Sequence, residues 1–324
     1  MKNLGWLLLA ILIAYGCAAV APPLRYRLRG RVGAFVGWCI VPIVLVCPLI
    51  IPSANVGLRA ASAFASTEII FKMVEYFRQW GNLERSIVLR DYYRFLIPFP
   101  VLSAVYPDHK RRLLLPESPW PQVLRLSGGI VGFTIAFLAV KALSASSLLR
   151  SSFALNHAAI LPIFVLAIES LSRTLYALER LAGFDTTPII RNAYLSRTVS
   201  EFWRRYNYRT HDWLYRNIFQ PTGGRRAPVR SILLVFLISG LFHELTFALA
   251  TSRLTGYQFA FFTIQGPAAL ASGRLERLAR RGGIAGKITA HGATILFIAV
   301  TSVLFFEGVS KIFRFVYVSQ SPLP

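Results

Sequence analysis

The chain has 324 residues, 55% of them hydrophobic, and a formal net charge of +22 at pH 7. Several uninterrupted apolar runs reach the length of about 20 residues that crosses a bilayer, so the sequence predicts a polytopic membrane protein. No recognisable nucleic-acid module accompanies the positive charge, and this excludes nucleic acid as the expected partner.

The apolar runs predict eight membrane spans, at about residues 3–22, 33–52, 60–77, 126–143, 153–172, 231–250, 257–272 and 288–308. The third, fifth and seventh are the weakest. The third contains Glu68, Lys72 and Glu75, so its alternative is an amphipathic helix lying partly in the membrane interface, which would reverse the sidedness of every later segment. We expect an all-α transmembrane bundle of about eight spans with interfacial or re-entrant amphipathic helices, built as a single domain over residues 1–324.

The first apolar run has the outline of a secretion signal, because it follows one basic residue and ends near Cys17. A signal carries its positive charge before the apolar run, whereas here four arginines follow it in residues 25–31. We therefore expect an uncleaved first span. Cys17, Cys39 and Cys47 all lie in apolar spans without the spacing of a metal site or a disulfide framework, so neither is predicted.

Basic residues gather on one side of the predicted bundle. With eight spans, 28 of the 36 Lys and Arg residues fall in four connections on the same side, residues 25–31, 78–125, 173–230 and 274–287. The positive-inside rule makes that side cytoplasmic and places both termini outside. This basic face suits anionic lipid headgroups and phosphate-bearing substrates, although setting the topology is a sufficient explanation for residues 25–31.

The connection after the fifth span contains a segment dense in aromatic and basic residues. Its sequence is SRTVSEFWRRYNYRTHDWLYRNIFQP over residues 196–221. Thr198 or Ser200 could cap a helix that begins there. On one helix, Trp203, Tyr206 and Asn207 would lie near one another with arginines interleaved. The alternative is an amphipathic helix that anchors this segment at the membrane surface. It explains the aromatic and basic residues, but it does not explain Asn207.

The sixth predicted span carries a titratable pair, His243 and Glu244, deep in an apolar run. A charged residue at the centre of a membrane helix costs about 2.5–3.5 kcal/mol on insertion scales, so such a pair is a functional-site hypothesis. The alternative is a neutral histidine that joins two helices by a hydrogen bond. Glu244 points about 100° away from His243 on a helix, which favours a packing or supporting role over direct pairing.

Motifs in the second half of the chain carry a family resemblance. They are EFWRRYN at 201–207, HDW at 211–213, IFQP at 218–221 and SGLFHE at 239–244, with weaker similarities in FKM at 71–73 and FFTIQG at 261–266. Together they resemble the membrane-bound O-acyltransferase superfamily, with the wax synthases and the sterol and diacylglycerol acyltransferases as the closest branches. The resemblance implies that Asn207 and His243 form the active site. Arg204 and Tyr206 depart from the wax-synthase pattern, in which Gly and Trp are usual, so the superfamily is assigned rather than the branch.

Residue types alone support acyl transfer from a thioester to a hydroxyl group. A neutral imidazole at His243 can take the hydroxyl proton near neutral pH, and an amide at Asn207 can stabilise the oxyanion or hold the thioester. Neither motif positions a nucleophilic Ser or Cys, which favours direct transfer over an acyl-enzyme. Acyl-CoA is the expected donor and co-substrate, with no further cofactor and no metal, and a lipophilic alcohol is the expected acceptor.

The donor's phosphates are expected to meet four arginines of the motif segment, which are Arg204, Arg205, Arg209 and Arg216. The other residues predicted to bind substrate are Phe202, Trp203, Tyr208, His211, Trp213, Glu244 and Gln265. Membrane lipids are expected around the spans, and the sequence assigns no oligomeric state.

Two other classes of function fit parts of the pattern. A proton-coupled transporter would use His243, Glu244, Glu169 and Lys72 as an intramembrane relay, but the sequence shows no inverted repeat and no pair of broken helices. A membrane scaffold that grips anionic lipid would need only the basic face. Within acyl transfer the acceptor stays open between a long-chain alcohol, a sterol-like or terpenoid hydroxyl, a diacylglycerol and a glycan, and the acyl chain could be as short as acetyl.

Overall fold

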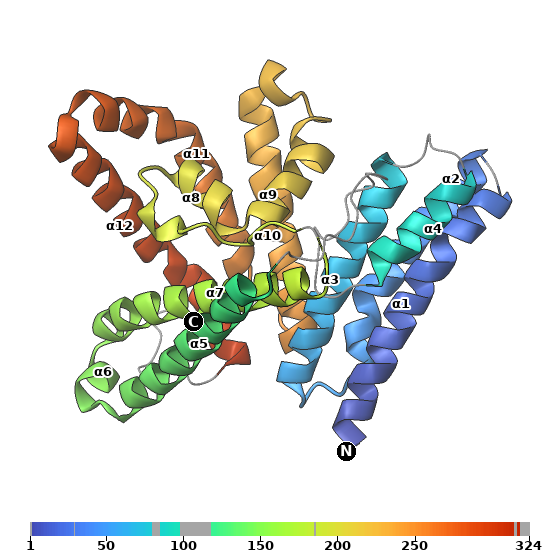
Figure 1. Cartoon of the computed structure of the whole chain (residues 1–324), viewed down its shortest axis with the longest axis horizontal. Coiled ribbons are helices and arrows are strands. Elements are labelled where there is room, and N and C mark those ends of the chain that lie inside the picture. Colours follow the sequence, from blue (N-terminus) through green and yellow to red (C-terminus); the bar gives the residue numbers. More distant parts are fainter. Residues whose placement is uncertain are drawn as a thin grey trace. The chain divides into compact units, whose positions relative to one another are not determined.

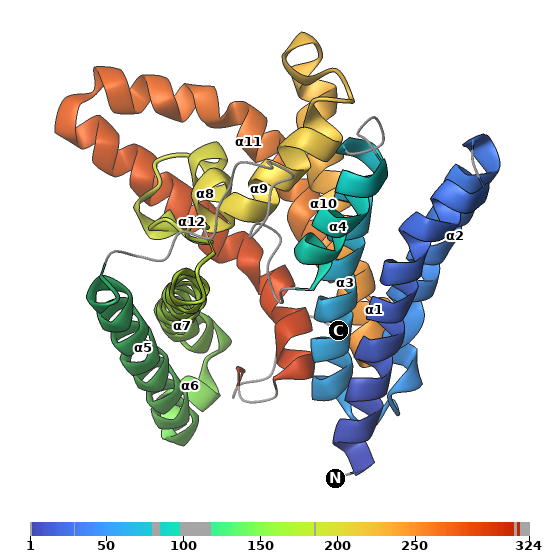
Figure 2. The same ribbon diagram turned by 45° about the vertical axis from the view of Figure 1, so that its right-hand side comes forward.

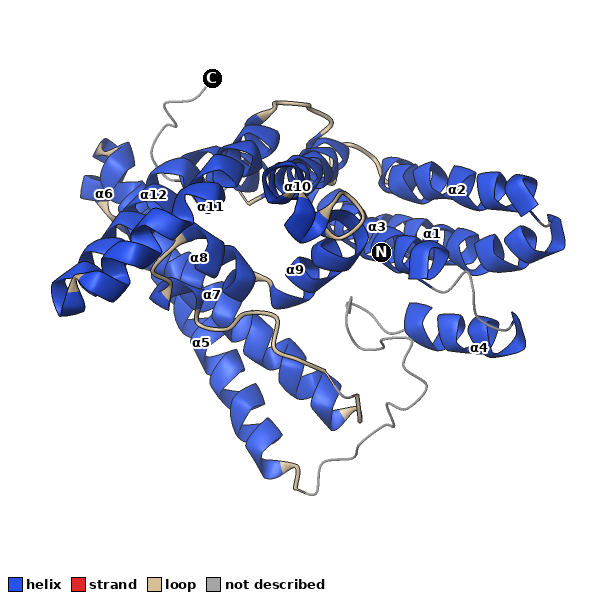
Figure 3. Ribbon diagram, turned by 90° about the horizontal axis from the view of Figure 1, so that it is seen from above, coloured by secondary structure: helices blue, strands red, loops and turns tan. Residues whose placement is uncertain are grey.

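The computed structural model describes residues 2–28, 30–79, 85–97, 118–184, 186–313 and 316–317. These residues form helices joined by turns, with no strand among them (Figure 3), and the all-α prediction is confirmed. The chain divides into two compact units, residues 1–112 with 242–255 and residues 113–241 with 256–324, and each is described by itself. The single-domain expectation stays a prediction.

The first unit consists of α1 (Lys2–Leu28), α2 (Gly30–Val46), the 3-10 turn η1 (Cys47–Ile50), α3 (Val56–Gln79), α4 (Arg85–Leu96) and the last part of α10 (Pro228–Thr251). Figure 2 shows α1, α2 and α3 alongside one another. The helix α2 turns back along α1, where Gly33 leaves no room for a Cβ beside the carbonyl oxygen of Arg25. The core between these helices is apolar and includes Val44, Ile69 and Met73.

Contacts along α3 show its direction within this unit. Arg25 Nη1 donates a hydrogen bond to the carbonyl oxygen of Phe77 at 3.2 Å, so α1 and α3 end side by side. The hydroxyl oxygens of Thr67 and Thr246 lie 3.0 Å apart, and the rings of Phe71 and Phe242 have centroids 5.0 Å apart. Helix α3 therefore runs antiparallel to the last part of α10. Its charged residues Glu68, Lys72 and Glu75 are buried, which explains how a helix of low hydropathy lies among apolar neighbours.

The second unit contains four long helices and the first part of α10. The long helices are α5 (Trp120–Ala145), α7 (Phe153–Leu181), which follows the short α6 (Ser147–Ser151), and the pair α11 (Tyr257–Arg281) and α12 (Gly283–Ile312). Helices α5 and α7 form an antiparallel hairpin (Figure 1). Gly129 and Gly132 of α5 face Ser170 of α7 so closely that a Cβ would not fit, as is typical of small residues between membrane helices.

Shorter elements of this unit carry the aromatic-basic motifs. They are the 3-10 turn η2 (Ala193–Leu195), α8 (Val199–Tyr206), α9 (Tyr208–Leu214), the π-helical turn η3 (Tyr215–Phe219) and the 3-10 turn η4 (Gly224–Arg226).

Helix α11 runs antiparallel to both of its long neighbours. Gly240 of α10 packs against Phe259 and Phe262, whereas Gly266 packs against Leu233 further back along α10. Gln258 Nε2 donates to the carbonyl oxygen of Phe305 in α12 at 2.9 Å. Figure 1 shows α11 and α12 meeting at the turn that joins them. The chain thus reverses its direction twice between α10 and α12.

Six of the described helices are long and apolar enough to cross a membrane: α1, α2 with η1, α5, α7, α10 and α12. The protein is therefore an integral multi-pass membrane protein. Helices α3 and α11, which cover the third and seventh expected spans, fall outside this set. Charged residues are spread along α3, whereas in α11 they lie in the last third and polar residues interrupt the apolar part. The count of eight stays a prediction, and it is supported by the antiparallel packing of α3 and α11 against helices that do have spanning length and hydropathy.

Candidate active site

Helix α8 begins at Val199, with Thr198 as its N-cap, and is fixed at its start by side chains. Thr198 Oγ1 accepts a hydrogen bond from the backbone N–H of Glu201 at 3.1 Å, and Glu201 Oε2 accepts one from the N–H of Arg197 at 2.9 Å. This arrangement satisfies N–H groups that a helix start leaves without partners. Of the two capping residues that the sequence offered, Thr198 is the one used.

Asn207 separates α8 from α9. Its backbone has φ −142° and ψ 81°, so it ends one helix and begins the next. The expectation that Trp203, Tyr206 and Asn207 share one continuous helix is wrong, because Asn207 favours the role of an N-cap over a helix interior. Its Oδ1 accepts a hydrogen bond from the backbone N–H of Thr210 at 3.1 Å. The NH₂ group makes no hydrogen bond with any described residue and is free to donate.

Trp203 lies in an aromatic cluster within the second unit. Its ring is 5.2 Å from that of Phe262 and 5.9 Å from that of Phe261, measured between centroids. Its Nε1–H donates to Oε1 of Gln265 at 3.2 Å, and Gln265 Nε2 donates to the hydroxyl of Thr301 at 3.0 Å. Gln265 is fully buried. These contacts hold the Trp203 ring against Gln265, and the substrate contact expected for Gln265 stays a prediction.

The four arginines expected to meet the donor lie in different surroundings. Arg205 forms an ion pair with Glu201 at 2.6 Å, and Arg216 forms one with Asp212 at 3.3 Å. Arg204 is exposed and makes no ion pair with the described residues. Of these four arginines, it is the one best placed for an anionic ligand.

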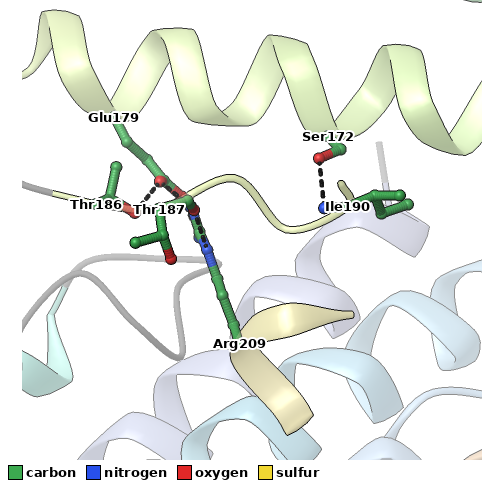
Figure 4. Close-up of polar contacts among 6 residues, drawn as sticks. All are labelled: Ser172, Glu179, Thr186, Thr187, Ile190 and Arg209. Carbon is green, nitrogen blue, oxygen red and sulfur yellow. Dashed lines mark hydrogen bonds and ion pairs between the residues drawn. The ribbon is translucent and has the colours of Figure 1, made fainter. Parts of the chain in front are cut away.

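Arg209 is buried and paired inside the protein. Its guanidinium group binds both carboxylate oxygens of Glu179, near the end of α7, and the two side chains are 3% and 8% exposed (Figure 4). Every nitrogen of the guanidinium group donates to a partner within the protein, so the phosphate contact expected for Arg209 would require these bonds to break. Glu179 was missed in the sequence, because it follows the expected span 153–172 and no motif includes it; the structure extends α7 to Leu181.

The remaining motif residues are partly or fully enclosed. Trp213 is buried, and Phe202 stacks on Tyr206 with centroids 5.3 Å apart. The guanidinium carbon of Arg191 lies 3.6 Å from the ring centroid of Tyr208. Burial, and next the nearby positive charge of Arg204, lowers the pKa of His211 below 6.5. Both effects favour the neutral imidazole at His211.

His243 and Glu244 lie in the part of α10 that belongs to the first unit. His243 is half-buried, and its predecessor Phe242 packs on Phe71 of α3. Glu244 is buried, and its Oε1 accepts a hydrogen bond from the backbone N–H of Thr255 at 2.8 Å, which closes the turn after α10. This contact gives Glu244 a partner within the protein, and its expected substrate contact stays a prediction. The pairing of His243 with Asn207 joins residues of different units and stays a prediction.

Comparison with known proteins gives one family match. The sequence model of the membrane-bound O-acyltransferase family matches residues 126–302, a range that includes both Asn207 and His243. Among the described residues, no cluster of three or more His, Cys, Asp or Glu side chains could hold a metal ion.

Individual relatives match shorter stretches. Diacylglycerol O-acyltransferase 1C of Glycine max is 30% identical over 100 residues, 31% of this chain and 19% of that protein. Diacylglycerol O-acyltransferase 1-2 of Oryza sativa subsp. japonica is 36% identical over 73 residues, 22% of this chain and 15% of that protein. A protein named "Probable alginate O-acetylase AlgI" from Pseudomonas syringae pv. tomato is 32% identical over 65 residues, 19% of this chain and 12% of that protein. Each of the three matches covers less than a fifth of the relative's own length.

Proposed function

This chain belongs to the membrane-bound O-acyltransferase family, and from that premise we propose that it is an enzyme that transfers an acyl group from acyl-CoA to a hydroxyl group of a lipophilic acceptor. The observation that carries the proposal is the state of the Asn207 amide. Its oxygen is held by the N–H of Thr210, and its NH₂ group is left to donate. A fixed amide donor of this kind suits a reaction in which negative charge develops on a carbonyl oxygen.

Asn207 stabilises or positions the reacting thioester in this proposal. When the acceptor hydroxyl attacks the thioester carbonyl, the carbonyl oxygen gains negative charge, and an N–H donor already in place lowers the barrier. Loss of one such donor in a dry site costs about 3–4 kcal/mol of transition-state stabilisation.

His243 is the general base. As attack begins, the acceptor hydroxyl must lose its proton, and a neutral imidazole can accept it near neutral pH. The proton then passes to the departing thiolate, so that CoA leaves as the free thiol. Both substrates react directly, and no covalent acyl-enzyme forms.

The donor's phosphates bind on the basic cytoplasmic face. Arg204 is the candidate contact, because it is exposed and makes no ion pair with the described residues. Arg205 and Arg216 can contribute by exchanging their present partners Glu201 and Asp212 for phosphate oxygens.

The acceptor is proposed as a long-chain alcohol or a similar lipophilic hydroxyl compound. The named relatives widen the range to be tested, because the soybean and rice proteins are named for diacylglycerol and the Pseudomonas protein for alginate acetylation. All of these acceptors present a hydroxyl group to the same chemistry.

The test is an assay of thiol release from acyl-CoA by the full chain purified into lipid nanodiscs. Donors from acetyl-CoA to palmitoyl-CoA are combined with hexadecanol, a sterol, a diacylglycerol and an oligosaccharide, and products are identified by mass spectrometry. We expect thiol release that requires both an acceptor and the intact chain, with a matching amount of ester. A chain that releases no thiol with any pair, in a sample that is folded and monodisperse, would contradict the proposal.

A further inference from the structure

A short strap holds both sides of the break at Asn207. We define the strap as residues 186–191, which follow α7 in the second unit. The backbone N–H of Tyr208 donates to the carbonyl oxygen of Ile189 at 2.8 Å, and the N–H of Arg191 donates to that of Arg205 at 2.9 Å. Arg205, two residues before Asn207, and Tyr208, directly after it, are therefore attached to one segment.

The strap and α9 are joined to α7 through one buried ion pair. Arg209 Nη1 donates to Glu179 Oε1 at 2.8 Å, and Arg209 Nη2 donates to the other carboxylate oxygen (Figure 4). Arg209 Nε also donates to the carbonyl oxygen of Thr187 at 2.8 Å, and Nη2 donates to the hydroxyl of Thr186 at 2.7 Å. The Thr186 hydroxyl in turn donates to Glu179 Oε2 at 2.8 Å.

A second hydrogen bond fixes the strap further along α7. Ser172 Oγ accepts from the backbone N–H of Ile190 at 3.0 Å (Figure 4). The strap is thus attached to α7 at two points, Ser172 and Glu179, and to the Asn207 break at three, Arg205, Tyr208 and Arg209.

The energetics of buried ion pairs indicate that the Arg209–Glu179 pair fixes geometry more than it adds stability. Taking two charges out of water offsets most of their attraction, so such a pair is weak evidence for stability by itself. A bidentate carboxylate–guanidinium contact does fix distance and orientation, because two parallel hydrogen bonds allow little rotation. Arg209 lies two residues from Asn207, so the constraint acts where the amide must be held.

We propose that Glu179 and Arg209 are positioning residues for Asn207. They hold α9 and the strap so that the Asn207 amide keeps one orientation toward the reacting thioester, and neither touches a substrate. This inference rests on the proposed function. It extends that function to Arg209, two positions after Asn207, and to Glu179 in the transmembrane helix α7, outside the motif segment.

The test compares Glu179→Gln and Arg209→Lys with a matched control. Glu179→Gln keeps the shape of the side chain and removes its charge, and Arg209→Lys keeps the charge and removes the bidentate contact. The control Lys311→Gln breaks an ion pair to Glu307, in α12 of the same unit, that has no contact with the strap. The double variant Glu179→Arg with Arg209→Glu restores opposite charges in exchanged positions.

Two readouts are taken on each protein in nanodiscs. Steady-state kinetics give kcat and the donor KM, and hydrogen exchange measures protection of residues 205–214 against that of α11 and α12. We expect Glu179→Gln to lower kcat by tenfold or more, up to roughly 10²-fold, as a displaced catalytic group does, with the donor KM changed less than about twofold. Exchange should rise in 205–214 alone, and Lys311→Gln should stay near the parent. The kcat of Arg209→Lys should lie between those of the parent and Glu179→Gln. The double variant with exchanged charges should recover part of the parental kcat.

The proposal is overturned if both single variants keep parental kcat, or if kcat falls only together with a rise in exchange over the whole protein. In the second case the pair serves general stability. A parent with no turnover would count against the proposed function instead, and the local exchange measurement would still decide whether the pair orders the Asn207 segment.

Discussion

Asn207 begins helix α9 by accepting the backbone N–H of Thr210 at its Oδ1, 3.1 Å away. One residue therefore ends α8, begins α9 and carries an amide whose orientation is fixed. The capping oxygen cannot also serve as a donor, so only the NH₂ group can meet a substrate oxygen. This separates the structural and chemical roles of Asn207 into two halves of one side chain.

Replacement of Asn207 by Asp tests that separation. Asp is as good an N-cap as Asn, so Asn207→Asp should keep the thermal stability of the parent. It removes both N–H donors, and its charge opposes an oxyanion, so kcat should fall by roughly 10²–10³-fold with little change in donor KM.

The companion variant Asn207→Ala removes both halves. It should lose the same activity and, in addition, about 1 kcal/mol of stability through the missing cap, measured as a lower unfolding temperature. If Asn207→Asp kept parental kcat, Asn207 would be a cap only, and the aromatic-basic segment would be an interfacial anchor.

Arg204 provides the prediction for donor binding. Because its guanidinium group is exposed, Arg204→Ala should raise the donor KM while kcat stays nearly unchanged, and the effect should weaken as salt screens the contact in the parent. Arg225→Ala, at another exposed arginine, is the control. Equal KM values for the parent and the Arg204 variant at low salt would show that the phosphates bind elsewhere.

Helix α3 and helix α11 decide the membrane topology. In a chain without Cys17, Cys39 and Cys47, single cysteines at Arg27 and Arg225 are predicted to be labelled from the same side, because four helices cross between them if α3 does. Labelling from opposite sides would place α3 in the interface.

The same logic applies to α11. A cysteine at Arg281 should be labelled from the side of Arg225, because α10 and α11 both cross between them, whereas one at Leu254 should be labelled from the other side. The positive-inside rule predicts that the shared side is cytoplasmic. An Arg281 label from the Leu254 side would mean that α11 does not cross.

His211 predicts a dependence of stability on pH. Its pKa in the folded protein lies below 6.5, first because of burial and then because of Arg204. Well above that pH, the imidazole is neutral in both the folded and the unfolded protein, so it does not change the free energy of unfolding. As the pH falls through 6.5 the unfolded chain gains a proton before the folded chain does, so the free energy of unfolding decreases.

Replacement by Gln removes this source of acid sensitivity. His211→Gln should show a smaller drop in unfolding temperature than the parent between about pH 7.5 and pH 5.5, a window around the unperturbed value for histidine. An unchanged drop would mean that His211 protonates equally easily in both states.

The sequence predicted most of the helices and the family, and it failed where contacts between distant residues decide. The spans could be found because their apolar runs are long, and the cap at Thr198 because of its residue type. The break at Asn207 was hidden, since the residues on both sides of it favour a helix. The pairing of Arg209 with Glu179 joins residues 30 positions apart through a strap without any periodic pattern, so sequence alone placed Arg209 among the donor contacts.

Ester formation by His243→Ala tests the central claim most directly. In a single turnover with excess enzyme, acyl-CoA and the best acceptor, the variant should fold and enter the membrane like the parent and form ester roughly 10²–10⁴-fold more slowly, because the hydroxyl proton has no acceptor. Binding of acyl-CoA, measured separately, should be unchanged. Ester formation at the parental rate by a correctly folded His243→Ala protein would contradict the assignment of His243 as the base and, with it, the proposed mechanism.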